Sequence, residues 1–138
     1  MTLNSPTTFT EAQHAGEFIV SEGPGTVSRD TETLQINHDL VDGTVLKFVV
    51  VSTVTYLAPL DADDFDTEGV DETVDLAGIL IGARDSTVTG TNAAIPGVPY
   101  IARMAEVNSS LLTLFTGSTA QELADVLVAL KANHVIGR

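Results

Sequence analysis

The 138-residue sequence contains no cysteine and no tryptophan, and it has only six lysines and arginines against 19 aspartates and glutamates. The lack of cysteine excludes disulfides, thiolate metal sites and cysteine nucleophiles. Direct binding to nucleic acid or to an anionic membrane is not expected, because both need clustered basic side chains. The longest apolar runs, Phe48–Val51 and Ile79–Ile81, are far shorter than the roughly 20 residues that span a bilayer. The opening Met1–Pro6 lacks the basic and apolar regions of a secretory signal.

The negative charge is concentrated in one short segment. Residues 61–75 contain eight acidic residues and no basic one, whereas residues 76–138 contain four of each. The length is that of one domain, and no linker or internal repeat divides it. We therefore expect one folded body that carries an acidic loop.

Short β-strands separated by turns account for most of the predicted structure. Residues Thr44–Tyr56 are rich in β-branched side chains and predict one long strand or two short ones, stopped by Pro59. In Leu76–Arg84, Gly78 and Gly82 suggest a bulge or a close backbone approach. Further strands are predicted at Glu17–Ser21, Thr87–Thr91 and Val98–Val107, and turns at Asp42-Gly43, Asp85-Ser86 and Pro96-Gly97.

One helix is predicted, at about residues 118–132. Ser118 and Gln121 have the spacing of a capping box, and the following leucines recur at helical intervals. Asn133 could take the left-handed conformation that ends a helix, and Val135-Ile136 would then form a terminal strand. The predicted fold class is α+β: short strands and turns around a small β-barrel-like core, with one C-terminal helix, a terminal strand and an extended N-terminal arm.

The acidic loop is one candidate binding site. Asp64, Asp66, Glu68, Gly69 and Asp75 match positions 1, 3, 5, 6 and 12 of a calcium loop. Position 12 has Asp75 instead of the usual glutamate, and no amphipathic helices flank the loop. A solvated surface loop is the favoured interpretation; a β-rich module that coordinates Ca²⁺ weakly through residues 61–75 is the alternative.

No catalytic set can be assembled from the sequence. His14, His38 and His134 are far apart and fall in no metal-binding or catalytic pattern. There is no nucleophile elbow and no phosphate-binding glycine loop. We predict that the protein is not an enzyme and has no cofactor.

The N-terminal 33 residues are the remaining candidate site. They are polar and punctuated by glycine and proline, yet they contain Phe9 and Phe18, which nothing nearby in the sequence can cover. Phe18-Ile19-Val20 has a strong β propensity and could add to a foreign sheet edge. A terminus without a role is the alternative interpretation.

Three patterns that follow one another along the chain resemble the lambda-type phage head decoration proteins. The first is Phe9-Thr10-Glu11, His14, Gly16-Glu17-Phe18, Ser21-Glu22, Gly25 and Ser28-Arg29-Asp30. The second is Ala77-Gly78-Ile79-Leu80, which follows the loop. The third runs from Ile101-Ala102-Arg103 through Ala105-Glu106-Val107-Asn108 and Leu111 to the final helix.

The resemblance implies a capsid-stabilising role. Such proteins form homotrimers on the outside of the expanded head, at local threefold sites, where they bind the major capsid protein and resist packaged-DNA pressure. It implies a virion protein made in the host cytoplasm, with a capsid-binding arm at residues 1–33 and a body at residues 34–138. We expect residues 1–8 to be mobile or variable, and residues from Glu17 onward to pack on the body or on a neighbouring subunit. The implied capsid-binding residues are Phe9, Thr10, Glu11, His14, Gly16, Glu17, Phe18, Ser28, Arg29 and Asp30.

Overall fold

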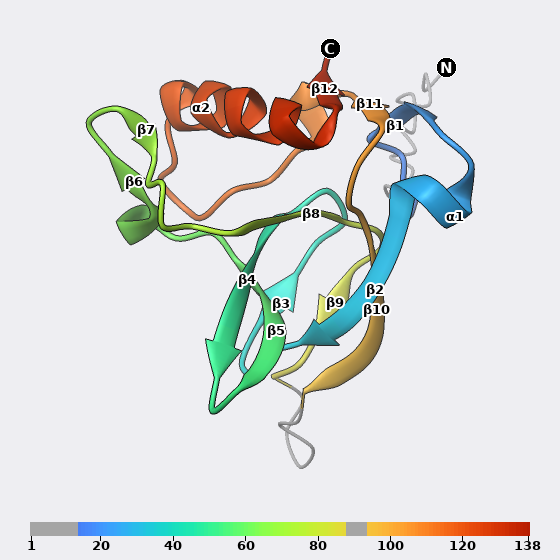
Figure 1. Cartoon of the computed structure of the whole chain (residues 1–138), viewed down its shortest axis with the longest axis vertical. Coiled ribbons are helices and arrows are strands. Elements are labelled where there is room, and N and C mark those ends of the chain that lie inside the picture. The colour runs from blue at the N-terminus through green and yellow to red at the C-terminus, as the bar shows by residue number, and fades with distance from the viewer. Residues whose placement is uncertain (1–13, 88–93) are drawn as a thin grey trace, which may run out of the picture.

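A closed five-stranded barrel forms the centre of the computed structural model, which describes residues 14–87 and 94–138 (Figure 1). Its strands, in spatial order, are β10 (Ile95–Ile101), β2 (Arg29–Leu34), β5 (Val54–Pro59), β4 (Val45–Val51) and β8 (Leu76–Leu80). Neighbouring strands are antiparallel except β2 and β5, which are parallel. Closure leaves the barrel without the unpaired edges that invite aggregation.

The barrel interior is filled by alternate side chains of its strands. Leu46 of β4 and Leu57 of β5 are fully buried, and Leu34, Leu80 and Val98 complete this core. Phe48 packs edge-on against Tyr100, with ring centroids 6.2 Å apart. The two-residue period of a strand places these side chains inward and their neighbours outward.

The predicted strand at Thr44–Tyr56 is two strands joined by a tight hairpin. Val51 of β4 pairs with Val54 of β5, so the loop consists of Ser52 and Thr53 alone. Both loop residues are left-handed, with φ of 50° and 71°. Two-residue hairpins favour this geometry because its twist matches that of the strands.

A second core lies between the barrel and a layer at one end of it. This layer contains a three-stranded sheet, β1 (Ile19–Glu22), β11 (Ala105–Val107) and β12 (Val135–Gly137), and the helix α2 (Ala120–Leu130) (Figure 1). β11 is the central strand and pairs antiparallel with β1 and parallel with β12. The buried residues of this core include Phe18, Val45, Ile79, Val126 and Leu130.

Helix α2 confirms the predicted helix but not its predicted caps. Thr119 is the N-cap, and Thr119 and Glu122 exchange the two capping-box hydrogen bonds; the prediction of Ser118 with Gln121 was one residue early. At the other end a 3₁₀ turn, η3 (Lys131–Asn133), follows, and His134 takes the left-handed conformation expected of Asn133. The predicted terminal strand is present as β12.

Two predicted turns are wrong. Pro96-Gly97 lies inside β10, where the register with β2 shifts between Ile95 and Val98 and Gly97 has a φ of 68°, so it is a bulge. Asp85 belongs to a short strand, β9 (Arg84–Asp85), which pairs with β3 (Asp39–Leu40). The predicted strand Val98–Val107 is divided between β10 and β11, and most of Thr87–Thr91 lies outside the described residues.

At Gly78 of β8 the backbone of β10 comes close enough to exclude a side chain. A Cβ atom on it would lie 1.9 Å from the carbonyl oxygen of Ile101, and its φ is 149°. The close approach predicted for this glycine is therefore confirmed.

The remaining elements are short. They are α1 (Gly25–Ser28), η1 (Ala62–Asp64), β6 (Phe65–Asp66), β7 (Gly69–Val70) and η2 (Ser109–Leu111). None of the helices in the described parts of the chain is long and apolar enough to cross a membrane. The described structure consists mostly of strands, with one long helix near the C-terminus. This architecture confirms the predicted α+β class.

Candidate functional site

The candidate site is the surface formed by residues 14–30, which make up most of the described part of the predicted arm (residues 1–33). It begins with a turn in which the amide of Glu17 donates to the carbonyl of His14. The amide of Gly16 donates to Asp42 Oδ1 (2.9 Å), and Gly82 N–H donates to the same oxygen (2.6 Å). The buried Asp42 carboxylate thus connects Gly16 to the loop after β8. The sequence predicted a turn at Asp42-Gly43 but not this contact.

Phe18 fixes this segment to the body. Its ring is fully buried in the core beneath α2, and its carbonyl accepts a hydrogen bond from Asn108 N (2.7 Å). As expected, Phe18 is not covered by its sequence neighbours; Val107 and Leu130, far away in sequence, lie in the same core, so the ring needs no partner outside the described body. The expectation that residues from Glu17 onward pack on the body is confirmed.

Strand β1 forms one edge of the three-stranded sheet. Within the described residues it pairs with β11 alone, so its second edge is open. Ile19 packs toward the core, whereas Val20 is 56% exposed. The strand thus presents unpaired backbone groups and an apolar side chain, the features that β-strand addition uses.

A charged cluster follows β1. Glu22 accepts hydrogen bonds from Ser28 Oγ (2.9 Å) and Arg29 Nε (2.9 Å), and it also pairs with Arg29 Nη2. The hydrogen bond from Arg29 lowers the pKa of Glu22, although partial burial opposes the shift. The carbonyl of Ser28 accepts from the amides of Ala102 and Arg103, so the cluster is held on the barrel.

The last charged pair of this surface joins Arg103 Nη1 to Asp30 Oδ2 at 3.6 Å. Both side chains are about half exposed. Beneath it, burial raises the pKa of Tyr100 to about 12, with further contributions from Asp30 and Glu32. Asp30 therefore belongs to an exposed network on β2.

The implied capsid-binding residues divide into three groups. His14, Glu17, Arg29 and Asp30 are exposed, and Gly16 is partly so. Phe18 and Ser28 are buried, so their side chains support the fold. Phe9, Thr10 and Glu11 lie outside the described residues. Strand β2 runs across the predicted boundary between residues 33 and 34, and that residues 1–33 act as a binding unit stays a prediction.

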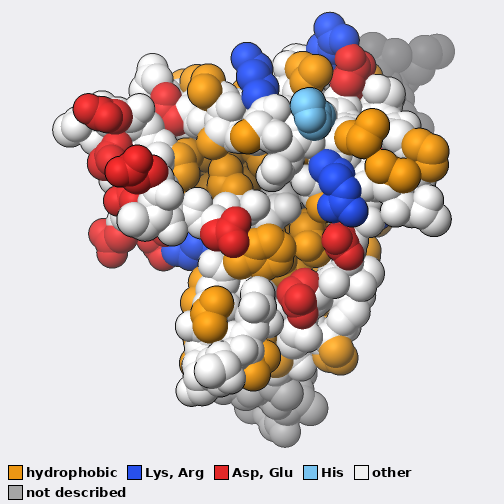
Figure 2. Space-filling model, viewed as in Figure 1, with side chains coloured by type: hydrophobic (Ala, Val, Ile, Leu, Met, Phe, Trp, Pro, Cys, Tyr) orange, Lys and Arg blue, Asp and Glu red, His pale blue; other side chains and the backbone are white. Residues whose placement is uncertain are grey.

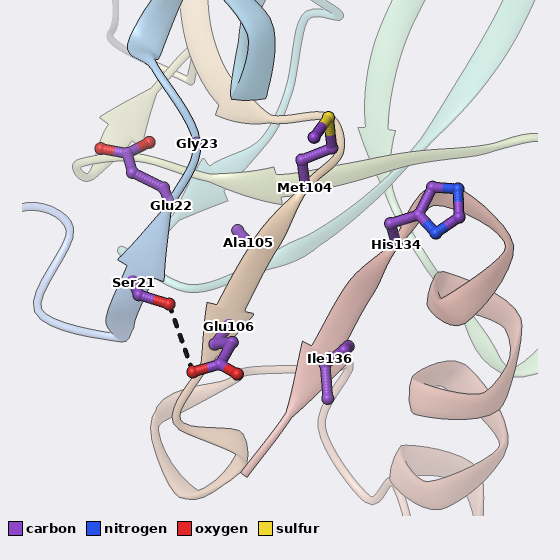
Figure 3. Close-up of a pocket in the computed structure, with 8 residues that line it drawn as sticks. All are labelled: Ser21, Glu22, Gly23, Met104, Ala105, Glu106, His134 and Ile136. Carbon is purple, nitrogen blue, oxygen red and sulfur yellow. Dashed lines mark hydrogen bonds between the residues drawn. The ribbon is translucent and has the colours of Figure 1, made fainter.

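A shallow hollow of about 460 Å³ lies beside this surface, between β1, β11 and β12 (Figure 3). Its lining residues include Met104, Ile136, Ser21, Glu106 and His134. Ser21 Oγ donates to Glu106 (3.2 Å), but the ring of His134 points away from both (Figure 3). The hollow therefore does not align a nucleophile with a base.

The acidic loop does not form the calcium site considered above. Asp64 is buried and pairs with Lys47 Nζ at 2.6 Å, and Asp61 pairs with the same nitrogen at 3.1 Å. Burial acts to lower the pKa of Lys47, but the hydrogen bonds that its ammonium donates to Asp64 and Asp61 outweigh this effect and raise the pKa. Asp66 instead accepts from the amide of Glu68 (2.8 Å). The four candidates Asp64, Asp66, Glu68 and Asp75 are not brought together, and across the described residues no three His, Asp or Glu side chains converge.

Comparison with protein families gives one match. The model of the family described as bacteriophage lambda head decoration protein D matches residues 8–135. The chain belongs to this family. The match confirms the resemblance inferred from the sequence and covers both arm and body. Comparison with curated proteins and with solved structures gave no match.

Membership in the head decoration family gives the chain a place in a phage. It is a virion component that associates with the capsid, and its family is structural instead of enzymatic.

Proposed function

We propose that this head decoration protein binds as a homotrimer to the outer surface of the expanded head, at local threefold sites. There it contacts the major capsid protein through its N-terminal segment and stabilises the shell against packaged-DNA pressure. The observation that carries the proposal is the family match over residues 8–135. We propose no catalytic activity and no cofactor.

The position of the described arm supports this proposal. Residues 14–18 lead directly into β1, whose second edge is open among the described residues, and Val20 of that strand is exposed. A capsid strand could continue the β1-β11-β12 sheet there, with backbone hydrogen bonds supplying affinity. His14 and Glu17, exposed on the turn before β1, would lie at the border of such a contact.

Trimer formation would strengthen a weak arm contact. Three arms on one lattice point bind with a high effective concentration once the first is engaged. The acidic loop at residues 61–75, away from β1, would keep a densely covered shell soluble. Synthesis in the host cytoplasm is the expected route to such a particle.

Deletion of residues 1–13 tests the proposal. The deletion removes Phe9, Thr10 and Glu11 but spares Phe18 and β1, whose removal would open the core. The shortened protein should keep its circular dichroism spectrum and its oligomeric mass. Its binding to purified expanded heads that lack decoration protein, measured by co-sedimentation, should fall at least about tenfold.

A matched control keeps the full length of the arm. The double variant Phe9→Ala and Glu11→Ala retains residues 1–13 and changes only two implied contact side chains. It should bind more weakly than the parent and more strongly than the deletion. Undiminished head binding by the deletion would refute the role of the arm, whereas lack of binding by the parent protein would refute capsid decoration through this surface.

A further inference from the structure

The tip of the β4–β5 hairpin carries an apolar surface that no described residue covers. Val51 and Val54 face each other across the hairpin and are 44% and 49% exposed. Val49 and Tyr56 form the next pair on the same face. A hollow of about 160 Å³ adjoins them, lined by Gln35, Ile36, Val51, Tyr56 and Ala94. We call Ile36, Val49, Val51, Val54 and Tyr56 the hairpin surface.

The three segments that contribute to or flank the hairpin surface contain no acidic and no basic side chains. Residues 33–37, 48–60 and 86–102 contain no aspartate, glutamate, lysine or arginine, in a chain whose net charge is −13. In Figure 2 the lowest described part of the molecule, where the hairpin tip lies, shows hydrophobic and neutral side chains, and acidic side chains are visible above it. Exposed apolar residues that cluster away from all charge are typical of a contact surface.

The hairpin loop is held in a strained conformation. Ser52 and Thr53 both have a positive φ, where asparagine and glycine are usual. For a β-branched residue such as Thr53 this conformation is costly. A strained tip that exposes Val50, at 67%, indicates that the shape of the hairpin is used in a contact.

We propose that the hairpin surface packs against a second copy of this chain and forms the interface of the trimer. The inference rests on the proposed function, because it assigns a surface to the trimer proposed there. Two copies with a net charge of −13 each repel one another, and the repulsion is weakest where neither copy carries charge.

The two faces of the hairpin suit a threefold ring. A ring of three copies uses a heterologous contact, in which two different patches of each copy meet. Val50 points away from the face that contains Val51, because successive side chains of a strand alternate. Val50 of one copy can therefore fill the 160 Å³ hollow beside Val51 and Tyr56 of the next.

The capsid is the less suitable occupant of this surface. The hairpin projects from the end of the barrel opposite β1 and the sheet that contains it (Figure 1). Contact with the shell through the segment before β1 would leave the hairpin far from that contact. A second copy can meet it there without competing with the shell.

The double variant Val51→Lys and Val54→Glu tests the inference. It places opposite charges directly across the hairpin, which preserves strand pairing and the net charge while introducing charge into the interface. The parent should have a solution mass near three times 14.5 kDa by light scattering, and the variant should be a folded monomer. The control Ala124→Glu and Val128→Lys puts the same charges on the exposed face of α2, where Val128 is 65% exposed, and should stay trimeric.

A milder variant covers the case in which the charged one does not fold. The double variant Val51→Thr and Val54→Thr keeps the β-branched shape of both side chains. On dilution, its trimer should dissociate at protein concentrations at least about tenfold higher than those at which the parent trimer dissociates. A folded hairpin variant that remains trimeric would overturn the assigned surface and leave capsid decoration standing. A trimeric variant that loses only head binding would also overturn it, by making the capsid the occupant. A monomeric parent would refute the proposed trimer itself.

Discussion

Replacing Phe18 by alanine should strongly destabilise the protein. The ring is fully buried in the core that α2 covers, beside Val107 and Leu130. Removing it leaves a cavity between β1, the barrel and the helix, because the pairing of β1 with β11 and the hydrogen bond from the Asn108 amide to the carbonyl of residue 18 hold the backbone in place. Phenylalanine-to-alanine changes at such sites cost about 3–5 kcal/mol.

The expected loss is a large fraction of the typical stability of a domain, about 5–15 kcal/mol. Urea unfolding, followed by circular dichroism at one fixed protein concentration, would measure it. The control is Val20→Ala, two residues away on the exposed side of β1, which should change stability by less than about 0.5 kcal/mol.

A loss below about 1 kcal/mol for Phe18→Ala would refute the reasoning. It would mean that residue 18 is a free arm residue in solution, and that its burial on the body contributes nothing to the fold. Equal losses for Phe18→Ala and Val20→Ala would likewise contradict the assignment of one residue to the core and the other to the surface.

Three further predictions concern single contacts. Thr119→Ala should cost about 1 kcal/mol in thermal unfolding, whereas Ser118→Ala should cost almost nothing, because Thr119 is the helix cap; equal effects would contradict this. Glu22→Gln should lower stability near neutral pH by less than about 1 kcal/mol, since the Arg29 partner is 44% exposed. The pKa of Glu22 is lowered in the fold, so this difference should be present above about pH 4.3 and vanish as the pH falls through the folded pKa; a pH-independent difference would count against the pair. Gly78→Ala should prevent formation of the native barrel, since its Cβ would overlap the Ile101 carbonyl; a native circular dichroism spectrum would show that β8 and β10 can separate.

The strand and helix content could be predicted because local patterns determine it. The β-branched run at Thr44–Tyr56 and the leucine spacing before Leu130 each specify their element without help from distant residues. The capping error at Ser118 arose because two adjacent hydroxyl residues each have a polar partner three positions later. In the structure the pair that forms the capping box is Thr119 with Glu122.

The arm was harder to predict because its partners are distant in sequence. The other buried members of the Phe18 core lie between Val45 and Val135, and Gly16 is bound by Asp42. Composition alone cannot distinguish a polar segment that lies on a body from one that is free. The exposed hairpin surface was missed for a similar reason: a run such as Phe48–Val51 predicts a strand but not which end of it extends beyond the core.

The pairing of β2 with β10 has a consequence for the order of folding. Arg29 at one end of this pair meets Ile101, 72 residues later in the chain, and β1 must wait for β11. Folds dominated by such non-local pairs form slowly, in milliseconds to seconds, because a long loop must close first. On a ribosome the hairpin β4–β5 can form early, but the barrel can close only after residue 101 has emerged. Nascent chains shorter than that expose the future core, so the rate of translation near the end of the message sets how long they stay vulnerable to aggregation.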